Sequence, residues 1–190
     1  MIVYLHGFRS APTSGKARLL AHRMAARGLA DRFWCEQLPV SPKQAIEFIE
    51  ASLTQCPSVP TLVGSSLGGY YATYLAEKHD LKAILINPAV TPYVTLAEFV
   101  GLQTNLYTSE NFDFTAEHIH ELTQLDTPVL TRPERYWLLV ETGDELLDYR
   151  QAVQRYAGAR QTVIEGGDHS FLHFPDFIDS IIEFSVQSNP

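Results

Sequence analysis

A length of 190 residues is typical of a single domain, and a composition of 45% hydrophobic and 19% charged residues is that of a globular protein rather than a disordered chain. The formal net charge of −8 argues against nucleic acid as a partner, because neutralising phosphates requires a basic surface. The two cysteines, Cys35 and Cys56, have neither the C-x-x-C spacing of a redox motif nor the number that a zinc cluster needs.

The chain begins with a short apolar run over residues 2–5, which predicts a strand. No basic leader precedes this run, which is unlike a cleaved signal peptide. No stretch of the sequence approaches the roughly 20 apolar residues of a membrane helix. We therefore expect a cytoplasmic protein without a membrane span.

Short runs rich in β-branched and aromatic residues alternate with longer amphipathic patterns along most of the chain. This alternation predicts βαβ units around a parallel sheet. The predicted strands are 2–5, 32–36, 61–65, 82–87, 135–141 and 160–165, and the predicted helices are near 15–28, 42–55, 67–79, 145–157 and 174–186. We expect an α/β fold, doubly wound, with about six mostly parallel strands in the order 2-1-3-4-5-6 and a site at their carboxyl ends.

The alternation is interrupted over residues 88–135. This segment is rich in aromatic side chains, contains no strand-like run, and predicts two helices, near 94–102 and 115–124. It is too long for an ordinary loop. We expect it to be a cap insertion over the site, within a single domain that spans residues 1–190.

The basic residues are concentrated at the start of the chain. Residues 1–32 carry six basic side chains against the single acid Asp31, a balance of +5, so the remainder of the chain carries −13. The six are Arg9, Lys16, Arg18, Arg23, Arg27 and Arg32. The favoured interpretation is a solvated helix face, and the alternative is attraction of an anionic substrate.

A His-Gly turn follows the first predicted strand directly, as His6-Gly7-Phe8. In an α/β-hydrolase such a turn supplies a backbone N–H to an oxyanion hole, here that of Phe8. His6 could be mistaken for a catalytic base. We expect it instead to support the turn through hydrogen bonds.

The strongest motif is Gly64-Ser65-Ser66-Leu67-Gly68, which matches G-x-S-x-G between an apolar strand and an amphipathic helix. In this context a serine sits on a strained turn with its hydroxyl exposed, and the flanking glycines avoid steric clashes there. Ser66 is at the centre of the pattern and is the predicted nucleophile, and Leu67 would supply the second oxyanion N–H. The alternative is a tight turn in which the two serines only cap the helix.

The predicted general base is His169, in the loop Gly166-Gly167-Asp168-His169 after the last predicted strand. Histidine is the side chain with an ordinary pKa near neutrality, and a position late in the chain fits the order nucleophile, acid, base. His173 is the nearest alternative. We expect it to be a packing or surface residue of the following helix.

The predicted orienting acid is Asp144, just past the strand 135–141, where a carboxylate can reach an imidazole N–H. Asp148 is the second candidate, although a solvated helix residue is the favoured interpretation for it. Asp168 adjoins His169 in the sequence, but neighbouring loop side chains seldom point together. We therefore reject Asp168 as the orienting acid.

His118 and His120, flanked by Glu117 and Glu121, could suggest a metal site. Residues two apart on a helix point in different directions, so the pair has no shared face. We expect no metal here and no other cofactor.

Taken together, these segments resemble the YqiA-like esterases, a family of small bacterial α/β-hydrolases. The resemblance extends over nearly the whole chain. It rests on Tyr4-Leu5-His6-Gly7-Phe8, Ser10-Ala11-Pro12 with Lys16-Ala17, residues 63–71, Ile86-Asn87-Pro88-Ala89, Thr142-Gly143-Asp144-Glu145 with Asp148-Tyr149, and residues 166–171.

The resemblance implies a sheet that lacks the first two strands of larger hydrolases, and a serine hydrolase acting on small carboxylic esters or acyl thioesters. It also implies a catalytic triad of Ser66, Asp144 and His169. The same triad could serve carbon–carbon bond hydrolysis or acyl transfer, and fold analogy does not separate these reactions. A ligand-binding module without catalysis is the remaining alternative.

Overall fold

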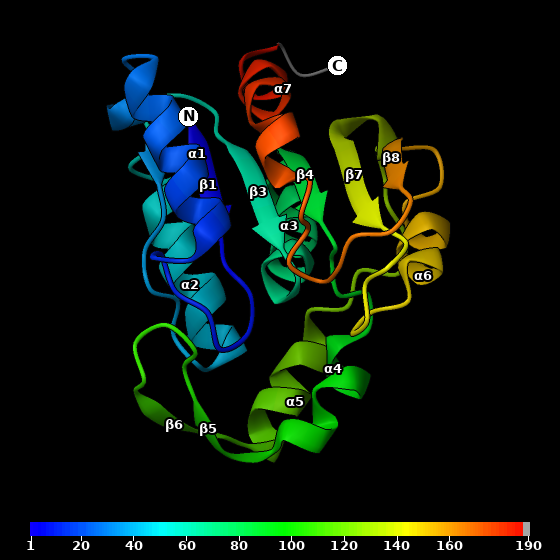
Figure 1. Cartoon of the computed structure of the whole chain (residues 1–190). Coiled ribbons are helices and arrows are strands. Elements are labelled where there is room, and N and C mark those ends of the chain that lie inside the picture. Colours follow the sequence, from blue (N-terminus) through cyan, green and yellow to red (C-terminus); the bar gives the residue numbers. More distant parts are fainter. Residues whose placement is uncertain (188–190) are drawn as a thin grey trace.

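A six-stranded parallel sheet forms the centre of the computed structural model, which describes residues 1–187 (Figure 1). The strands are β1 (Ile2–Leu5), β2 (Phe33–Trp34), β3 (Thr61–Ser65), β4 (Lys82–Ile86), β7 (Tyr136–Glu141) and β8 (Arg160–Ile164). Their order is β2-β1-β3-β4-β7-β8, so the predicted fold class and strand order are confirmed. The register pairs Leu5 with Gly64 and Ser65 with Ile86, which brings the carboxyl ends of β1, β3 and β4 to one edge.

Outside the segment between β4 and β7, five α-helices of the described residues connect these strands or follow them. They are α1 (Gly15–Ala26), α2 (Pro42–Leu53), α3 (Leu67–His79), α6 (Tyr149–Arg155) and α7 (Phe174–Val186). A helix predicted from residue 145 begins only at Tyr149, because the preceding residues form a turn around the Asp144 carboxylate, which accepts hydrogen bonds from two backbone N–H groups. Within residues 1–187, no helix combines the length and the apolar character required to cross a lipid bilayer.

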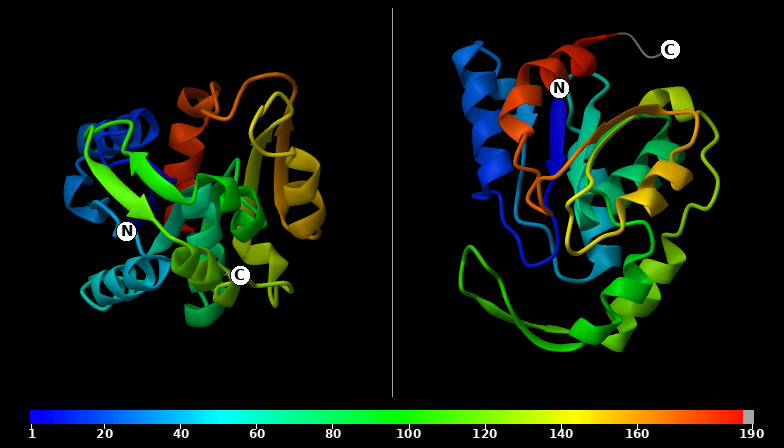
Figure 2. Two further views of the ribbon diagram at one scale, coloured as in Figure 1. Left: turned by 90° about the horizontal axis from the view of Figure 1, so that it is seen from below. Right: turned by 45° about the vertical axis from the view of Figure 1, so that its right-hand side comes forward.

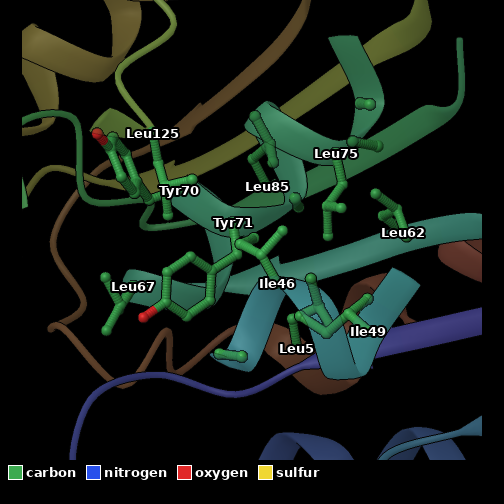
Figure 3. Packing of buried hydrophobic residues seen from close by; sticks show 14 of the residues in the cluster. Leu5, Ile46, Ile49, Leu62, Leu67, Tyr70, Tyr71, Leu75, Leu85 and Leu125 are labelled. Atoms are coloured by element: carbon green, nitrogen blue, oxygen red, sulfur yellow. The ribbon is translucent and has the colours of Figure 1, made fainter. Parts of the chain in front are cut away.

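Alternate residues of the strands face two separate apolar layers, as the period of a strand requires. One layer joins residues such as Leu5, Leu62 and Leu85 to α2 and α3 (Figure 3). The other joins the intervening strand residues to α1 and α7. Because both faces are covered, the polar side chains available to a ligand gather at the strand ends.

The last helix is anchored to the sheet by a buried lysine. Lys82 at the start of β4 donates hydrogen bonds of 2.6 Å from its Nζ to the backbone oxygens of Phe184 and Gln187. Burial lowers the pKa of this ammonium group. Carbonyls at the end of α7 offset the cost of burying this positive charge, since the C-terminal end of a helix carries unsatisfied oxygens and a partial negative charge.

The segment between β4 and β7 differs from its prediction. It contains α4 (Pro92–Thr95), the 3₁₀ helix η2 (Ala97–Phe99), strands β5 (Gly101–Thr104) and β6 (Asn111–Phe114), α5 (Ala116–Gln124) and the 3₁₀ helix η3 (Pro133–Arg135). The helix predicted near 115–124 is present, but the expectation of a helix at 94–102 and of no strand is wrong. β5 and β6 pair as an antiparallel hairpin beyond the carboxyl edge of the sheet (Figures 1 and 2).

Candidate active site

Ser66 lies at the sharp turn between β3 and α3. Its backbone has φ 55° and ψ −121°, a strained conformation for a residue with a Cβ. The chain folds tightly around it: a Cβ on Gly68 would clash with the carbonyl of Leu5, and a Cβ on Gly64 would clash with the carbonyl of Gly68. The two glycines are therefore required for close backbone approach.

Three side chains from different loops form one row of hydrogen bonds at this turn. The Ser66 hydroxyl lies 3.1 Å from Nε2 of His169, and Nδ1 of His169 lies 2.9 Å from Oδ2 of Asp144. The Asp144 side chain is only 2% exposed. Its Oδ1 also accepts hydrogen bonds of 2.9 Å from the N–H groups of Leu146 and Leu147, which fix its orientation.

The alternative acids and the alternative base have other partners. Asp148 caps α6 by accepting a hydrogen bond from the N–H of Arg150 at 3.0 Å. Asp168 accepts from Ser170 at 2.8 Å, and Nδ1 of His173 contacts the carboxylate of Glu141 at 2.8 Å. In the part of the chain that the structure describes, none of the three joins the row from Ser66 to Asp144.

The backbone N–H groups of Phe8 and Leu67 lie beside the serine. Leu67 is the first residue of α3, where helix N–H groups lack internal partners. The turn that carries Phe8 is close, since a Cβ on Gly7 would lie 3.1 Å from Cβ of Ser66. Across residues 1–187, no carbonyl or side chain accepts a hydrogen bond from either N–H group.

His6 connects this turn to the neighbouring loop. Its Nδ1 donates to the carbonyl of Gly7 at 3.0 Å, and its Nε2 accepts from the N–H of Leu38 at 3.1 Å. Burial lowers its pKa, which keeps the imidazole neutral and suits one donor and one acceptor nitrogen. These contacts agree with support of the turn rather than proton transfer.

Two buried polar residues that the sequence analysis did not single out as site residues hold the His169 loop. Glu141, at the end of β7, accepts hydrogen bonds from the N–H groups of Asp168 (2.8 Å), Leu172 (3.1 Å) and His173 (2.9 Å). Asn87, after β4, donates to the carbonyl of Asp168 at 3.0 Å and accepts from the N–H of Glu141 at 3.0 Å. The loop thus depends on one carboxylate and one amide.

Replacing Glu141 with glutamine should lower the free energy of unfolding at pH 7 by about 2–4 kcal/mol, because an amide cannot accept all of these hydrogen bonds inside the protein. Burial opposes ionisation of the Glu141 carboxyl, but hydrogen bonds from His173, Asp168 and Leu172 outweigh it and lower its pKa.

A lowered folded-state pKa stabilises the protein above the ordinary value of 4.5, and this stabilisation disappears as pH falls through the folded value. The difference in the free energy of unfolding between wild type and Glu141→Gln, measured by urea unfolding, should therefore become smaller at low pH. Glu47, exposed on α2, provides the matched control Glu47→Gln. If this difference in the free energy of unfolding did not change with pH, Glu141 would not be ionised in the folded protein.

Two pockets meet at Ser66 and His169. One of about 500 Å³ extends toward the start of α1, and the other of about 360 Å³ extends under the segment between β4 and β7. The first is lined by polar and apolar side chains together, including Ser10, Ser14, Lys16, Leu19, Leu106, Glu145, Leu146, Ser170, Leu172 and Phe174. The second is more apolar, with Leu67, Ala89, Thr95, Leu96, Phe99, Leu106 and Leu147.

The Phe8 side chain packs against the segment that holds the hairpin. Its ring lies 5.9 Å from that of Phe99, 6.0 Å from that of Phe112 and 4.9 Å from that of Phe114, measured between centroids. Arg9 adds a hydrogen bond of 2.9 Å from its Nε to the carbonyl of Thr104. These contacts fix one wall of the second pocket relative to the turn that follows β1.

The histidines of α5 take part in local contacts. His118 accepts the N–H of Thr115 in a capping box at the start of α5, and His120 contacts the amide of Gln124 at 2.9 Å. Among residues 1–187, no three or more His, Cys, Asp or Glu side chains are grouped so that they could hold a metal ion.

Comparisons with known proteins agree with this architecture. Residues 1–186 match the Uncharacterised protein family (UPF0227). Mouse alpha/beta hydrolase domain-containing protein 10 has a TM-score of 0.66 and 21% identity, covering 96% of this chain and 89% of its own. A monoacylglycerol lipase from Paleococcus ferrophilus has a TM-score of 0.69 and 15% identity, covering 96% of this chain and 92% of its own. Est1E from Butyrivibrio proteoclasticus has a TM-score of 0.66 and 13% identity, covering 96% of this chain and 85% of its own. These similarities show the α/β-hydrolase fold alone.

Proposed function

Since the chain belongs to the UPF0227 family and has an α/β-hydrolase fold, we propose that it is a serine hydrolase of small carboxylic esters or acyl thioesters. Ser66 is the nucleophile, His169 the general base and Asp144 the residue that orients the imidazole. The observation that carries the proposal is the row of hydrogen bonds of 3.1 Å and 2.9 Å that links these three side chains.

In the first half of the reaction, Oγ of Ser66 attacks the acyl carbon while Nε2 of His169 takes the hydroxyl proton. The carbonyl oxygen gains a negative charge, which the N–H groups of Phe8 and Leu67 stabilise. The imidazolium then gives its proton to the leaving oxygen or sulfur, the bond to the acyl carbon breaks, and an acyl-enzyme remains on Ser66.

In the second half, a water molecule replaces the alcohol or thiol. His169 takes one proton from this water as its oxygen attacks the acyl carbon, and returns the proton to Oγ of Ser66 when the acyl bond breaks. The carboxylate of Asp144 stabilises the imidazolium in both halves. The chemistry uses side chains and backbone groups only, and no cofactor enters it.

The size of the apolar pocket supports a preference for short to medium acyl groups. Its volume of about 360 Å³ is at the small end of the range for ligand sites. Each methylene that fits contributes only about 1–3 kcal/mol, so the preference should be graded rather than absolute.

The test is labelling by a fluorophosphonate probe together with release of 4-nitrophenol from 4-nitrophenyl butyrate. A serine hydrolase should be labelled at one site, located by mass spectrometry of the peptide containing Ser66, and labelling should abolish ester turnover. A folded protein that neither reacts with the probe nor hydrolyses any of a panel of esters and thioesters would be a ligand-binding module, and the proposal would be wrong.

A further inference from the structure

The beginning of α1 enters the same pocket as the candidate nucleophile. Ser14, Gly15 and Lys16 line the pocket of about 500 Å³ together with Ser66 and His169. The helix that starts there has 12 residues, and its first turn contains no acidic side chain. Its N-terminus therefore presents a partial positive charge to the pocket.

The start of α2 is closed, in the sense that side chains accept hydrogen bonds from its free backbone N–H groups. There the Ser41 hydroxyl accepts a hydrogen bond from the N–H of Gln44 at 3.2 Å, and the Glu121 carboxylate accepts from the N–H of Lys43 at 3.1 Å. At α1, the side chain of the capping residue Ser14 makes no such bond. The N–H groups at the start of α1 are thus available to a ligand.

Ser14 itself is a buried polar side chain without a partner. It is 6% exposed, and its hydroxyl makes no hydrogen bond to any group in the described part of the chain. Since Ser14 lines the pocket, its hydroxyl can donate to a molecule bound there.

Lys16 brings a positive charge to the same place. Its Nζ donates one hydrogen bond, of 2.7 Å, to the carbonyl of Ser170, and an ammonium group has three protons to donate. Burial lowers its pKa to about 8, while the carboxylates of Asp168, Glu141 and Asp144 act in the opposite direction. An anion close to Nζ would favour the charged form further.

Glu145 lines this pocket, and it and the other acidic side chains nearby accept hydrogen bonds from other donors. Glu141 and Asp144 each accept backbone N–H groups, Asp168 accepts from Ser170, and Glu145 accepts from the N–H of His169 at 2.9 Å. Lys16 and Ser14 are not among these donors. The Ser14 hydroxyl and the two further protons of the Lys16 ammonium are therefore not taken up by these carboxylates.

We propose that the pocket at the start of α1 is a subsite for a phosphate monoester carried on the alcohol portion of the substrate. The Lys16 ammonium, the Ser14 hydroxyl and the N–H groups at the start of α1 are its donors. Phosphate fits this set because it offers three oxygens to donors from several directions, and a helix N-terminus binds it readily. The acyl group then occupies the apolar pocket on the other side of Ser66.

This inference rests on the proposed esterase activity and assigns its substrate class. It also gives a role to one of the basic residues near the start of the chain. Arg23 and Arg27 bind Asp179 of α7, and Arg9 donates to Thr104 in the hairpin. Lys16 reaches the pocket that contains Ser66.

The first test compares 1-butyrylglycerol with 1-butyrylglycerol 3-phosphate, which differ only in the phosphate on the leaving alcohol. The wild type should have a kcat/KM at least about tenfold higher for the phosphorylated ester, as expected for charge-assisted hydrogen bonds. Lys16→Met should reduce this ratio to near one, and Ser14→Ala should reduce it partly. The ratio within one variant cancels general damage to the site.

Lys43 offers a matched control, because it also occupies the second position of a 12-residue helix but lies at the closed start of α2. Lys43→Met should keep the wild-type ratio. A wild-type ratio near one, or a ratio that Lys16→Met leaves unchanged, would overturn the proposal.

A second test does not depend on catalysis. Inorganic phosphate is titrated calorimetrically into Ser66→Ala and into Ser66→Ala/Lys16→Met, and we expect binding that weakens at least about tenfold in the double variant. If neither ester is hydrolysed but this difference is found, the esterase proposal fails and the anion subsite stands. Equal affinities, or no binding to Ser66→Ala, would disprove the subsite.

Discussion

Replacing Ser66 with alanine should lower kcat for ester hydrolysis by about 10⁴-fold or more, because the covalent route through the acyl-enzyme is lost. The Ser66 hydroxyl makes its hydrogen bond to His169 at the pocket surface, so its removal should leave the fold intact. The measurement is steady-state turnover of 4-nitrophenyl butyrate, together with a thermal unfolding curve. Fluorophosphonate labelling should disappear in the same variant.

Ser65 provides the control on the same turn. It is the last residue of β3, is buried, and is absent from the row of hydrogen bonds that ends at Asp144. Ser65→Ala should therefore keep substantial turnover and probe labelling. Labelling that persists in Ser66→Ala and is lost in Ser65→Ala would transfer the role of nucleophile to Ser65.

The second large effect is expected for Asp144→Asn, which should lower kcat about 10⁴-fold. The Asp144 carboxylate accepts a hydrogen bond from the Nδ1–H of His169, which keeps the proton on Nδ1 and leaves Nε2 free to take the proton of Ser66. An asparagine can present its amide to Nδ1, which favours the tautomer that carries the proton on Nε2. The imidazole then cannot act as a base toward the serine.

Asp148→Asn separates this role from a general effect of removing an acid nearby. Asp148 caps α6 and is exposed, so its replacement by asparagine should cost little activity and lower the free energy of unfolding by at most about 1 kcal/mol. The pair is compared by kcat and KM for one ester. A larger loss of kcat in Asp148→Asn than in Asp144→Asn would identify Asp148 as the orienting acid.

The parallel sheet could be predicted from sequence because its strands are buried on both faces. Residues 83–86 and 136–140 are continuously apolar, and such runs bounded by turn residues have few other interpretations. The turn at Ser66 was predictable for a related reason. Close contacts between backbone segments require its two glycines, so these contacts of the folded chain are visible in the local sequence as a G-x-S-x-G pattern.

The hairpin of β5 and β6 could not be recognised in this way. It has solvent on one side, so β5 contains a single large apolar residue, Leu102, which is exposed. The helical pattern at 94–102 was misleading because Pro92 starts the helix two residues earlier and Gly101, with φ +126°, ends the segment in an extended strand. Only Phe112 and Phe114 alternate as a half-buried strand should.

The support of the His169 loop was missed because it depends on long-range contacts. Glu141 is 27 residues from Asp168, and Asn87 is 81 residues from it. One signal was available: a carboxylate that directly continues an apolar strand is buried with it and needs several donors. The three predicted triad residues do meet in the fold, and their catalytic roles stay predictions.

The attachment of α7 to the sheet affects how the protein assembles during its synthesis. Lys82 and its acceptor Phe184 are 102 residues apart, so the apolar face of the sheet that α1 and α7 cover together stays partly uncovered until residues 174–186 have left the ribosome. The loop with His169 precedes this helix directly. Ser66 therefore meets the imidazole of His169, 103 residues later in the chain, at the same late step, and a nascent chain exposes an apolar surface that chaperones can bind before these two side chains are in contact.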